Sequence, residues 1–155
     1  MLEIERKFLI DRLPERLEIF PHEPVRQGYV AADPNGTVVR LRQKGDRFYL
    51  TVKSAGERAR IEREVLLAAD QFEALWPATE GRRLEKTRYY LPHGAYTIEL
   101  DVYHGALEGL FTAEVEFESH AAAEAYAPPA WFGREVTYDP RYKNLQLATR
   151  GRPPA

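Results

Sequence analysis

The sequence predicts a mainly β, α+β fold: a closed eight-stranded antiparallel β-barrel tunnel with a few peripheral helices. Turn signals divide most of the chain into about eight short segments, and most of these segments alternate charged with apolar residues. Alternation with a period of two places the charged side chains on one face of a strand and the apolar side chains on the other. Closing such a sheet into a barrel removes its edges and gives the charged faces a common interior.

The turns between the expected strands contain Gly, Pro, Asn or Asp. Asp33-Pro34-Asn35-Gly36 is a hairpin signal, and Lys44-Gly45-Asp46 and Pro92-His93-Gly94 mark two further turns. Strands are expected at residues 2–10, 27–30, 37–42, 47–53, 60–66, 83–91, 95–103 and 110–119. Helices are expected at residues 70–76, 120–126 and 140–149, from a capping residue, an alanine-rich run and a proline in the first turn.

Length and composition indicate one folded domain at residues 1–150, with a frayed tail at residues 151–155. The 155 residues are 44% hydrophobic and 30% charged, and the net charge of −2 argues against a general nucleic-acid binder. Without cysteine, the chain has no disulfide, thiolate nucleophile or cysteine metal site. No apolar run approaches the ~20 residues of a membrane span, and the charged N-terminus is unlike a signal peptide, so a cytoplasmic location is expected.

The first strand carries the most informative row of charge. Glu3, Glu5 and Lys7 lie two residues apart, so they share one face at intervals of about 6.7 Å. At an effective dielectric of about 20, two carboxylates at this separation repel each other by roughly 2.5 kcal/mol. Water or a divalent cation between them would relieve that repulsion. Taken alone, the row is also what an ordinary solvent-exposed strand shows.

The same spacing recurs on later strands, where each row carries mostly one sign of charge. The basic residues are Lys7, Arg40, Arg42, Lys53, Lys86 and Arg88, and the acidic residues are Glu3, Glu5, Glu62, Glu64, Glu99, Asp101, Glu114 and Glu116. A sheet face that only met solvent would be better served by mixed signs along each strand. Segregated rows therefore indicate a site that binds a metal ion and an anion together.

The two sets of residues suit two different ligands. Arginine and lysine side chains bind phosphate oxygens, and carboxylates without His or Cys suit Mg²⁺ or Mn²⁺. Cations and a metal ion around a chain of phosphates describe phosphoryl transfer, in which catalysis is largely positioning and charge stabilisation. The chain has no Gly-x-Ser-x-Gly elbow, phosphate-binding glycine loop or dinucleotide fingerprint that would indicate another chemistry.

These motifs, in this order, resemble the CYTH superfamily, also called triphosphate tunnel metalloenzymes, and in particular its short bacterial inorganic triphosphatase-like members. The resemblance runs from Leu2 to about Leu147. The motifs that carry it are Glu3-Ile4-Glu5-Arg6-Lys7, Val39-Arg40-Leu41-Arg42, Leu50-Thr51-Val52-Lys53, Glu62-Arg63-Glu64, Lys86-Thr87-Arg88-Tyr89, Glu99-Leu100-Asp101-Val102 and Ala113-Glu114-Val115-Glu116-Phe117-Glu118. The resemblance implies a single triphosphate tunnel domain over residues 1–150 and a hydrolase that acts on triphosphates with Mg²⁺ or Mn²⁺.

The resemblance also implies a role for each charged residue. Glu3, Glu5 and Glu116 would hold the principal metal ion, with Glu114 nearby, and Arg40, Arg42, Lys53, Lys86 and Arg88 would bind the phosphates. Lys7 would contact the phosphate under attack or its water, and Glu64 and Asp101 would position water or a second metal ion. The implied catalytic set is Glu5, Lys7, Glu64 and Asp101.

Members of the superfamily differ in the reaction that they catalyse. Short members hydrolyse tripolyphosphate to pyrophosphate and phosphate, whereas others are adenylate cyclases that form cyclic AMP and pyrophosphate from ATP, or thiamine triphosphatases. The chain has little insertion to build a pocket for a base or thiazole ring, which favours the inorganic substrate. A polyphosphate-binding module without catalysis would have no use for the acidic rows. The aromatic residues Trp131 and Phe132, if exposed, could support a homodimer; no nucleic-acid or membrane partner is expected.

Overall fold

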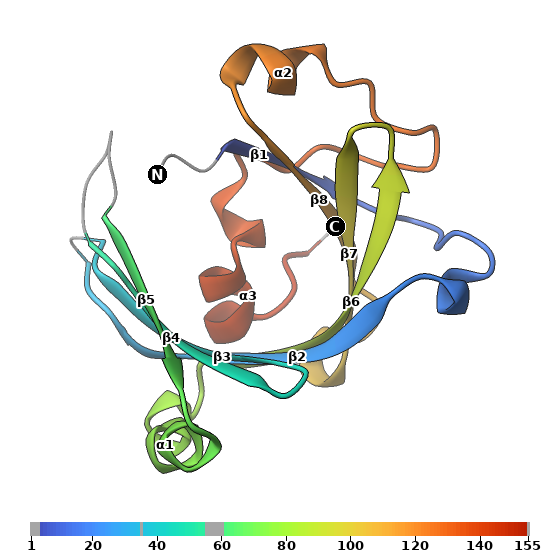
Figure 1. The fold of residues 1–155 in the computed structure, drawn as a ribbon. Helices are drawn as coiled ribbons and strands as arrows, with labels where there is room; N and C mark the ends of the chain where they lie inside the picture. Colours follow the sequence, from blue (N-terminus) through green and yellow to red (C-terminus); the bar gives the residue numbers. More distant parts are fainter. Residues whose placement is uncertain (1–3, 35, 55–60, 155) are drawn as a thin grey trace.

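Eight antiparallel strands form one strongly curved sheet (Figure 1). The structure, a computed structural model, describes residues 4–34, 36–54 and 61–154. The strand order is β1-β8-β7-β6-β2-β3-β4-β5. The strands are β1 (Ile4–Leu9), β2 (His22–Ala32), β3 (Val38–Lys44), β4 (Arg47–Lys53), β5 (Glu62–Leu67), β6 (Arg83–His93), β7 (Tyr96–Tyr103) and β8 (Phe111–Phe117). The predicted mainly β fold, with antiparallel strands and few helices, is confirmed.

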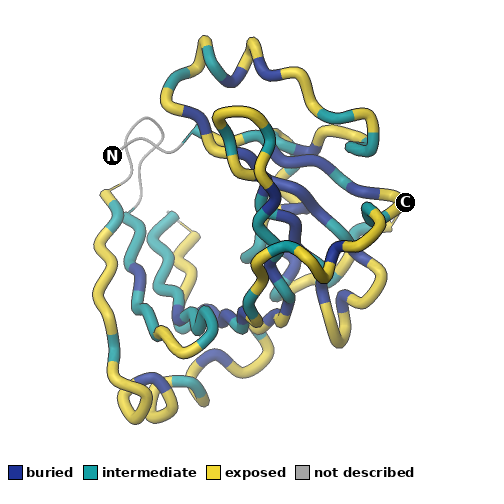
Figure 2. The backbone as a smooth tube through the Cα atoms, turned by 45° about the vertical axis from the view of Figure 1, so that its right-hand side comes forward, coloured by how far each residue is buried: buried dark blue, intermediate teal, exposed yellow. Residues whose placement is uncertain are grey.

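The sheet bends into a trough, with β1 at one rim and β5 at the other (Figure 1). Within the described residues, these two strands end the order and are not paired with each other. The strand β8 is mostly buried and β6 and β7 are partly buried, whereas β5 is mostly exposed along its length (Figure 2). The trough therefore has one well-packed wall and one open rim.

The helices are short and lie at the ends and outside of the sheet. They are α1 (Ala69–Leu75), α2 (His120–Ala125) and α3 (Asn144–Arg150), with 3₁₀ turns η1 (Leu17–Ile19), η2 (Trp76–Thr79), η3 (Gly105–Leu107) and η4 (Pro140–Tyr142). The Ser119 side chain caps α2 by accepting from the amide of Ala122. The prediction of one helix over residues 140–149 is wrong, because Lys143 is extended (φ −67°, ψ 142°) and separates η4 from α3.

Cross-strand register places the predicted charged rows on the same face of the sheet. Lys7 lies opposite Glu114, and Glu114 lies opposite Glu99; further along, Arg88 lies opposite Asp101. Directly opposed residues in an antiparallel pair project on the same side. The helices α1 and α2 pack on the other side (Figure 1), so the charged rows line the inside of the trough. We call this side the inner face.

Apolar residues on the outer face form the main core. The cluster contains Ile10, Leu17, Leu91, Ile98, Leu100, Ala113, Val115, Phe117, Ala123 and Tyr126. Trp131 and Phe132 pack against this cluster, and the Phe132 ring lies 4.8 Å from that of Phe8. The exposure expected of these two aromatic side chains is therefore wrong, because the core half-covers them.

A second apolar cluster covers one end of the inner face. It joins Leu84 and Tyr103, which belong to the inner rows of β6 and β7, to Tyr142 and Leu147 from the C-terminal segment. The Tyr103 hydroxyl donates to Oδ1 of Asn144, 2.8 Å away, at the start of α3. The C-terminal helix thus closes this end of the trough with apolar side chains, and the charged rows begin just beyond it.

Residues 133–137 run along the free edge of β1. Three backbone hydrogen bonds join the segment to β1. The Gly133 amide donates to the Leu9 carbonyl (2.7 Å), and the Leu9 amide donates to the Arg134 carbonyl (2.8 Å). The Val136 amide donates to the Lys7 carbonyl (2.8 Å). A Cβ atom at residue 133 would lie 2.7 Å from the Leu9 carbonyl oxygen, so only glycine allows this approach. The segment covers the β1 edge from Lys7 to Leu9 and protects it from other strands.

Gly28 is a second position where packing requires glycine, and replacing it by Ala is expected to lower the free energy of unfolding by about 1–3 kcal/mol through overpacking. An added Cβ would lie 2.6 Å from Cβ of Thr79, which is fully buried. Thr79 cannot move aside easily, because its hydroxyl donates to the carbonyl of Trp76 (2.7 Å) and accepts from Arg83 Nε (2.8 Å). Urea unfolding of the two proteins measures the difference.

Thr79→Gly removes the opposing Cβ and supplies the control for the Gly28 substitution. The cost of Gly28→Ala is expected to shrink in the Thr79→Gly background, as it should for two groups in contact. An equal cost in both backgrounds would contradict the steric explanation.

Within the described part of the chain, no helix has the length and apolar character needed to cross a membrane.

Candidate functional site

The cross-strand register places the predicted site residues of seven strands on the inner face. Glu3 lies outside the described residues, and the other predicted residues all lie on described strands. The inner-face positions are Glu5 and Lys7 on β1, Arg40 and Arg42 on β3, Lys53 on β4, Glu62 and Glu64 on β5, Lys86 and Arg88 on β6, Glu99 and Asp101 on β7, and Glu114 and Glu116 on β8. One surface therefore holds both sets of charge.

Asp101 is the centre of a buried ion cluster on the packed wall. Its Oδ1 lies 2.8 Å from Arg88 Nε and its Oδ2 lies 2.9 Å from Arg88 Nη2. The Lys86 ammonium lies 2.8 Å from the same Oδ2, and Arg88 Nη1 donates to Glu99 at 2.6 Å. Asp101 is completely buried. Both inner-face cations of β6, Lys86 and Arg88, are therefore held by carboxylates of β7.

The electrostatics of this cluster follow from its burial. Burial alone would raise the pKa of Asp101, but Arg88 and Lys86 outweigh it and hold that pKa well below the ordinary value. Burial lowers the pKa of Lys86 to about 8, against the opposing attraction of Asp101. Burial also raises the pKa of the Glu99 carboxyl, although Arg88 opposes this shift. Because both Asp101 oxygens face cations, this carboxylate orients Lys86 and Arg88 toward the trough.

Lys7 is fixed by the C-terminal segment. Its ammonium donates to the carbonyl of Tyr142 at 2.6 Å and lies 3.4 Å from Oε1 of Glu114. Its backbone amide donates to the hydroxyl of Thr137 at 3.0 Å. An ammonium has three protons, and the described residues provide one hydrogen bond and one ion pair, so the group can also donate to a ligand. Burial would raise the pKa of Glu114, but Lys7 and then Arg88 outweigh it and lower that pKa.

Arg40 and Arg42 on β3 form the opposite wall, which has few counter-charges. Among the described residues, the buried Nε atoms of both have no hydrogen-bond partner. Arg40 has a distant ion pair with Glu64 at 4.0 Å, and Arg42 has no ion pair with any described residue. Burial lowers the pKa of Arg42, and repulsion from Arg40 and Arg88 lowers it further. A buried cation without a counter-charge is costly, so this wall is suited to an anionic ligand.

Glu64 and Lys53 belong to the open rim of the same wall. Oε2 of Glu64 accepts from the Thr51 hydroxyl at 2.9 Å, and the carboxylate is more than a third exposed. Lys53 lies opposite Glu62 in the β4–β5 register and is half-buried. Within the described residues, no carboxylate forms an ion pair with Lys53.

Glu5 and Glu116 form the candidate metal site. They are direct cross-strand partners on β1 and β8, and both are exposed on the inner face. Like charges directly opposite each other destabilise a sheet, and a cation between them would remove that penalty. In the described part of the chain, no group of three His, Cys, Asp or Glu side chains is gathered closely enough to hold a metal ion. The pair nevertheless fits Mg²⁺, which binds through one or two carboxylates together with substrate phosphates and water.

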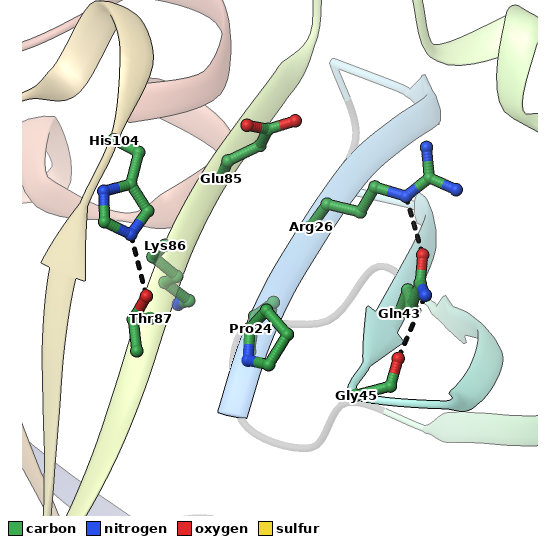
Figure 3. Close-up of a pocket in the computed structure, with 9 residues that line it drawn as sticks. Pro24, Arg26, Gln43, Gly45, Glu85, Lys86, Thr87 and His104 are labelled. Atoms are coloured by element: carbon green, nitrogen blue, oxygen red, sulfur yellow. Dashed lines mark hydrogen bonds between the residues drawn. The ribbon is translucent and has the colours of Figure 1, made fainter. Parts of the chain in front are cut away.

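A cavity of about 370 Å³ opens beside this pair. Glu99 and Glu116 line it together with Tyr90, Tyr96 and the β6–β7 hairpin. Another cavity, of about 330 Å³, lies on the outer face between β2 and β6 (Figure 3). There Arg26 donates to Gln43 at 2.7 Å and also pairs with Glu73. Arg26, which lines this cavity, is therefore already neutralised by Glu73. The charged rows lie on the opposite side of the sheet from this cavity.

Sequence reasoning missed several inner-face residues because two strands are longer than expected. β2 begins at His22, not at residue 27, and so places Glu23 opposite Arg88. β3 ends at Lys44, not at residue 42, and adds a third basic residue to its row. The alternation Arg40, Arg42, Lys44 was a usable signal, but Lys44 stands next to Gly45 and reads as the start of a turn.

Comparison with known proteins identifies the family. The CYTH domain matches residues 1–151. The chain is 51% identical over 150 residues to an inorganic triphosphatase of Nitrosomonas europaea, covering 96% of this chain and 97% of that protein. It is 36% identical over 147 residues to an inorganic triphosphatase of Acetivibrio thermocellus, covering 94% and 92%. A crystal structure of the inorganic triphosphatase NE1496 superposes with a TM-score of 0.76 at 46% identity, covering 100% of this chain and 98% of that chain. The chain therefore belongs to the CYTH domain family.

Proposed function

We propose that this chain is a metal-dependent hydrolase that converts inorganic tripolyphosphate to pyrophosphate and phosphate. The observation that carries the proposal is the pair Arg40 and Arg42, whose buried Nε atoms have no hydrogen-bond partner among the described residues. Arg42 has no ion pair with any described residue, and Arg40 has only a distant one, 4.0 Å from Glu64. Two relatives that cover nearly the whole chain are named inorganic triphosphatases, which supports the choice of substrate.

Two walls of cations would grip the phosphate chain. Lys86 and Arg88 are oriented by Asp101 before any ligand binds, and Arg40, Arg42 and Lys53 stand across from them. Cations that are already in place need no reorganisation when charge develops on the phosphates, which is how such sites accelerate phosphoryl transfer. The Lys7 ammonium would donate a hydrogen bond to an oxygen of the phosphate under attack.

Glu5 and Glu116, with Glu3 and Glu114 as further candidates, would hold Mg²⁺ or Mn²⁺. The ion would supply charge neutralisation for phosphate oxygens and a lowered pKa for water. Glu64 would accept a proton from the attacking water, because only one of its oxygens receives the Thr51 hydroxyl. Asp101 would act as a positioning residue for Lys86 and Arg88, because both of its oxygens already face these cations.

The closed tunnel is part of this proposal. The curvature of the sheet brings the β5 rim toward the side of β1 (Figure 1). Residues 133–137 occupy the β1 edge from Lys7 to Leu9, so contact with β5 would have to use the N-terminal half of β1. In such a tunnel the phosphates would be enclosed by charge on all sides and shielded from water, which strengthens each contact.

The experiment is hydrolysis of tripolyphosphate with Mg²⁺, followed by release of inorganic phosphate. Removal of the metal with EDTA is expected to stop release, and added Mg²⁺ or Mn²⁺ should restore it. Glu5→Gln and Lys53→Ala are each expected to lower the rate to background, because they remove a metal ligand and a phosphate contact. Arg63→Gln, on the outer side of β5, is the matched surface control and should keep full activity.

Retained activity in both Glu5→Gln and Lys53→Ala would contradict the site. ATP with Mn²⁺ distinguishes the cyclase alternative: formation of cyclic AMP, with negligible hydrolysis of tripolyphosphate, would overturn the proposed reaction. Thiamine triphosphate tests the remaining alternative in the same assay. Stoichiometric binding of tripolyphosphate with no release of phosphate would indicate a binding module.

A further inference from the structure

Lys44 continues the basic row of β3 by one step. The inner-face order along this strand is Arg40, Arg42, Lys44. Lys44 lies opposite Val25 of β2, and Val25 in turn lies opposite Lys86 of β6. Lys44 and Lys86 therefore occupy one row with a single strand between them, about 10 Å apart at the backbone. Their two ammonium groups could meet one phosphate chain from opposite sides.

Lys44 is half-buried. Its side chain forms no ion pair or hydrogen bond with any described residue. The nearest carboxylate on this part of the inner face is Glu23, and both of its oxygens are engaged. Oε1 lies 3.1 Å from Arg47 Nη2, and Oε2 accepts from the hydroxyl of Tyr90. Glu23 is thus committed to other groups, which leaves the charge of Lys44 available for a ligand.

Lys44 lies in the inner-face row of β3, so its side chain projects into the trough. Burial lowers the pKa of Lys44, and repulsion from Arg42 and then Arg88 lowers it further, against a weaker attraction from Glu23 and Glu99. A cation in this position is held against repulsion in the free protein, and an anion that binds there would relieve it.

We propose that Lys44 is a further phosphate-binding residue, which contacts the end of the phosphate chain that lies nearest the β3–β4 hairpin. This inference rests on the proposed function, since it extends the same site. It assigns the part of the trough next to the β3–β4 hairpin to one terminal phosphate. It also predicts that Lys44 helps to select a chain of three phosphates over pyrophosphate, because a shorter chain cannot reach Lys44 while it stays in contact with the rest of the site.

The test is equilibrium binding of tripolyphosphate and of pyrophosphate, measured by calorimetry in EDTA so that no turnover occurs. A lost charge-assisted contact is expected to raise the Kd of Lys44→Gln for tripolyphosphate about tenfold or more. The Kd for pyrophosphate should change less than threefold, and Lys44→Arg should restore most of the tripolyphosphate affinity. Arg63→Gln removes the same charge from the outer face and controls for long-range electrostatics.

Steady-state hydrolysis with Mg²⁺ gives a second readout. Lys44→Gln should raise KM for tripolyphosphate with kcat within about threefold of wild type, because Lys44 contacts a terminal phosphate and not the reacting water. Urea unfolding should show no loss of stability, since no partner is left unpaired. An unchanged Kd in Lys44→Gln, or an equal loss for both anions, would overturn the inference while wild-type hydrolysis still supported the proposed function. Wild-type protein that neither binds nor hydrolyses tripolyphosphate would overturn both.

Discussion

Arg42→Gln is expected to lower kcat/KM for tripolyphosphate by about 100- to 1,000-fold, the range seen when one preorganised donor to a developing charge is removed. Arg42 belongs to the β3 wall, and its buried Nε has no hydrogen-bond partner among the residues that the structure describes. A guanidinium in this position can bind two phosphate oxygens at once, and glutamine cannot replace either the charge or the paired geometry. The loss should therefore appear in binding and in turnover together.

The same substitution is expected to leave the free protein at least as stable as wild type. Burial lowers the pKa of Arg42, and Arg40 and Arg88 lower it further. The charged form of Arg42 is therefore disfavoured in the folded protein, and removing the charge relieves a repulsion that no described carboxylate offsets by ion pairing. A site that holds like charges together for its ligand commonly loses stability to do so.

Unfolding in urea without ligand, together with kinetics, measures both effects. Arg63→Gln supplies the control, because it removes an arginine charge from the exposed outer side of β5 and should change neither quantity by much. Full activity in Arg42→Gln would remove Arg42 from the phosphate site. A large loss of stability would show that Arg42 has a structural partner, contrary to the geometry described above.

Asp101→Asn is expected to have the opposite effect on stability and to lower the free energy of unfolding by about 3–5 kcal/mol, the usual cost of breaking a buried ion pair from one side. Asparagine keeps the shape of the side chain but leaves Lys86 and Arg88 buried without the negative charge that lies 2.8 Å from each of them. The wild-type carboxylate stays ionised because these cations hold its pKa below the ordinary value. Its contribution is therefore present above the unfolded pKa of an aspartate and falls as the pH drops below that value.

Urea unfolding near neutral pH measures this loss, with exposed Asp11→Asn as the matched control. Tripolyphosphate in EDTA should restore part of the stability of Asp101→Asn, because phosphate oxygens can supply the missing negative charge. Asp101→Asn with wild-type stability would mean that the cluster contributes little to folding. Restoration by chloride at equal ionic strength would point to general screening instead of a specific anion.

Most of the inner face could be predicted from the sequence because alternation is a local signal. Arg40 and Arg42, Lys86 and Arg88, and Glu114 and Glu116 are each two residues apart, and period-two spacing decides which side of a strand they share. Register then follows from keeping the apolar side of every strand in the core. The mainly β class and the number of strands could therefore be predicted without any knowledge of contacts.

The pairing of charges could not be predicted in the same way. The sequence separates acids from bases by strand, which favours a metal ion for one set and phosphate for the other. The structure instead joins Asp101 and Glu99 to Lys86 and Arg88, and it gives Arg42 no ion pair within the described part of the chain. Which cation meets which carboxylate depends on the order of strands in the sheet, and β7 neighbours β6 while β3 does not.

Helix ends and strand ends were the other source of error. Extended backbone at Lys143 divides the last predicted helix, and no residue type in that segment marks the break. Lys44 lies in a strand although it precedes a turn glycine. Trp131 and Phe132 are covered by a core that is assembled from distant strands, so their environment depends on tertiary packing that no local window contains.

The last twenty or so residues carry none of the predicted phosphate or metal ligands, yet they fix the position of Lys7 through the backbone of Val136, the hydroxyl of Thr137 and the carbonyl of Tyr142. Removing residues from the C-terminus should therefore abolish catalytic activity before it unfolds the sheet. The C-terminal segment must pack against β1, more than a hundred residues earlier in the chain, before the ammonium group of Lys7 is held in place.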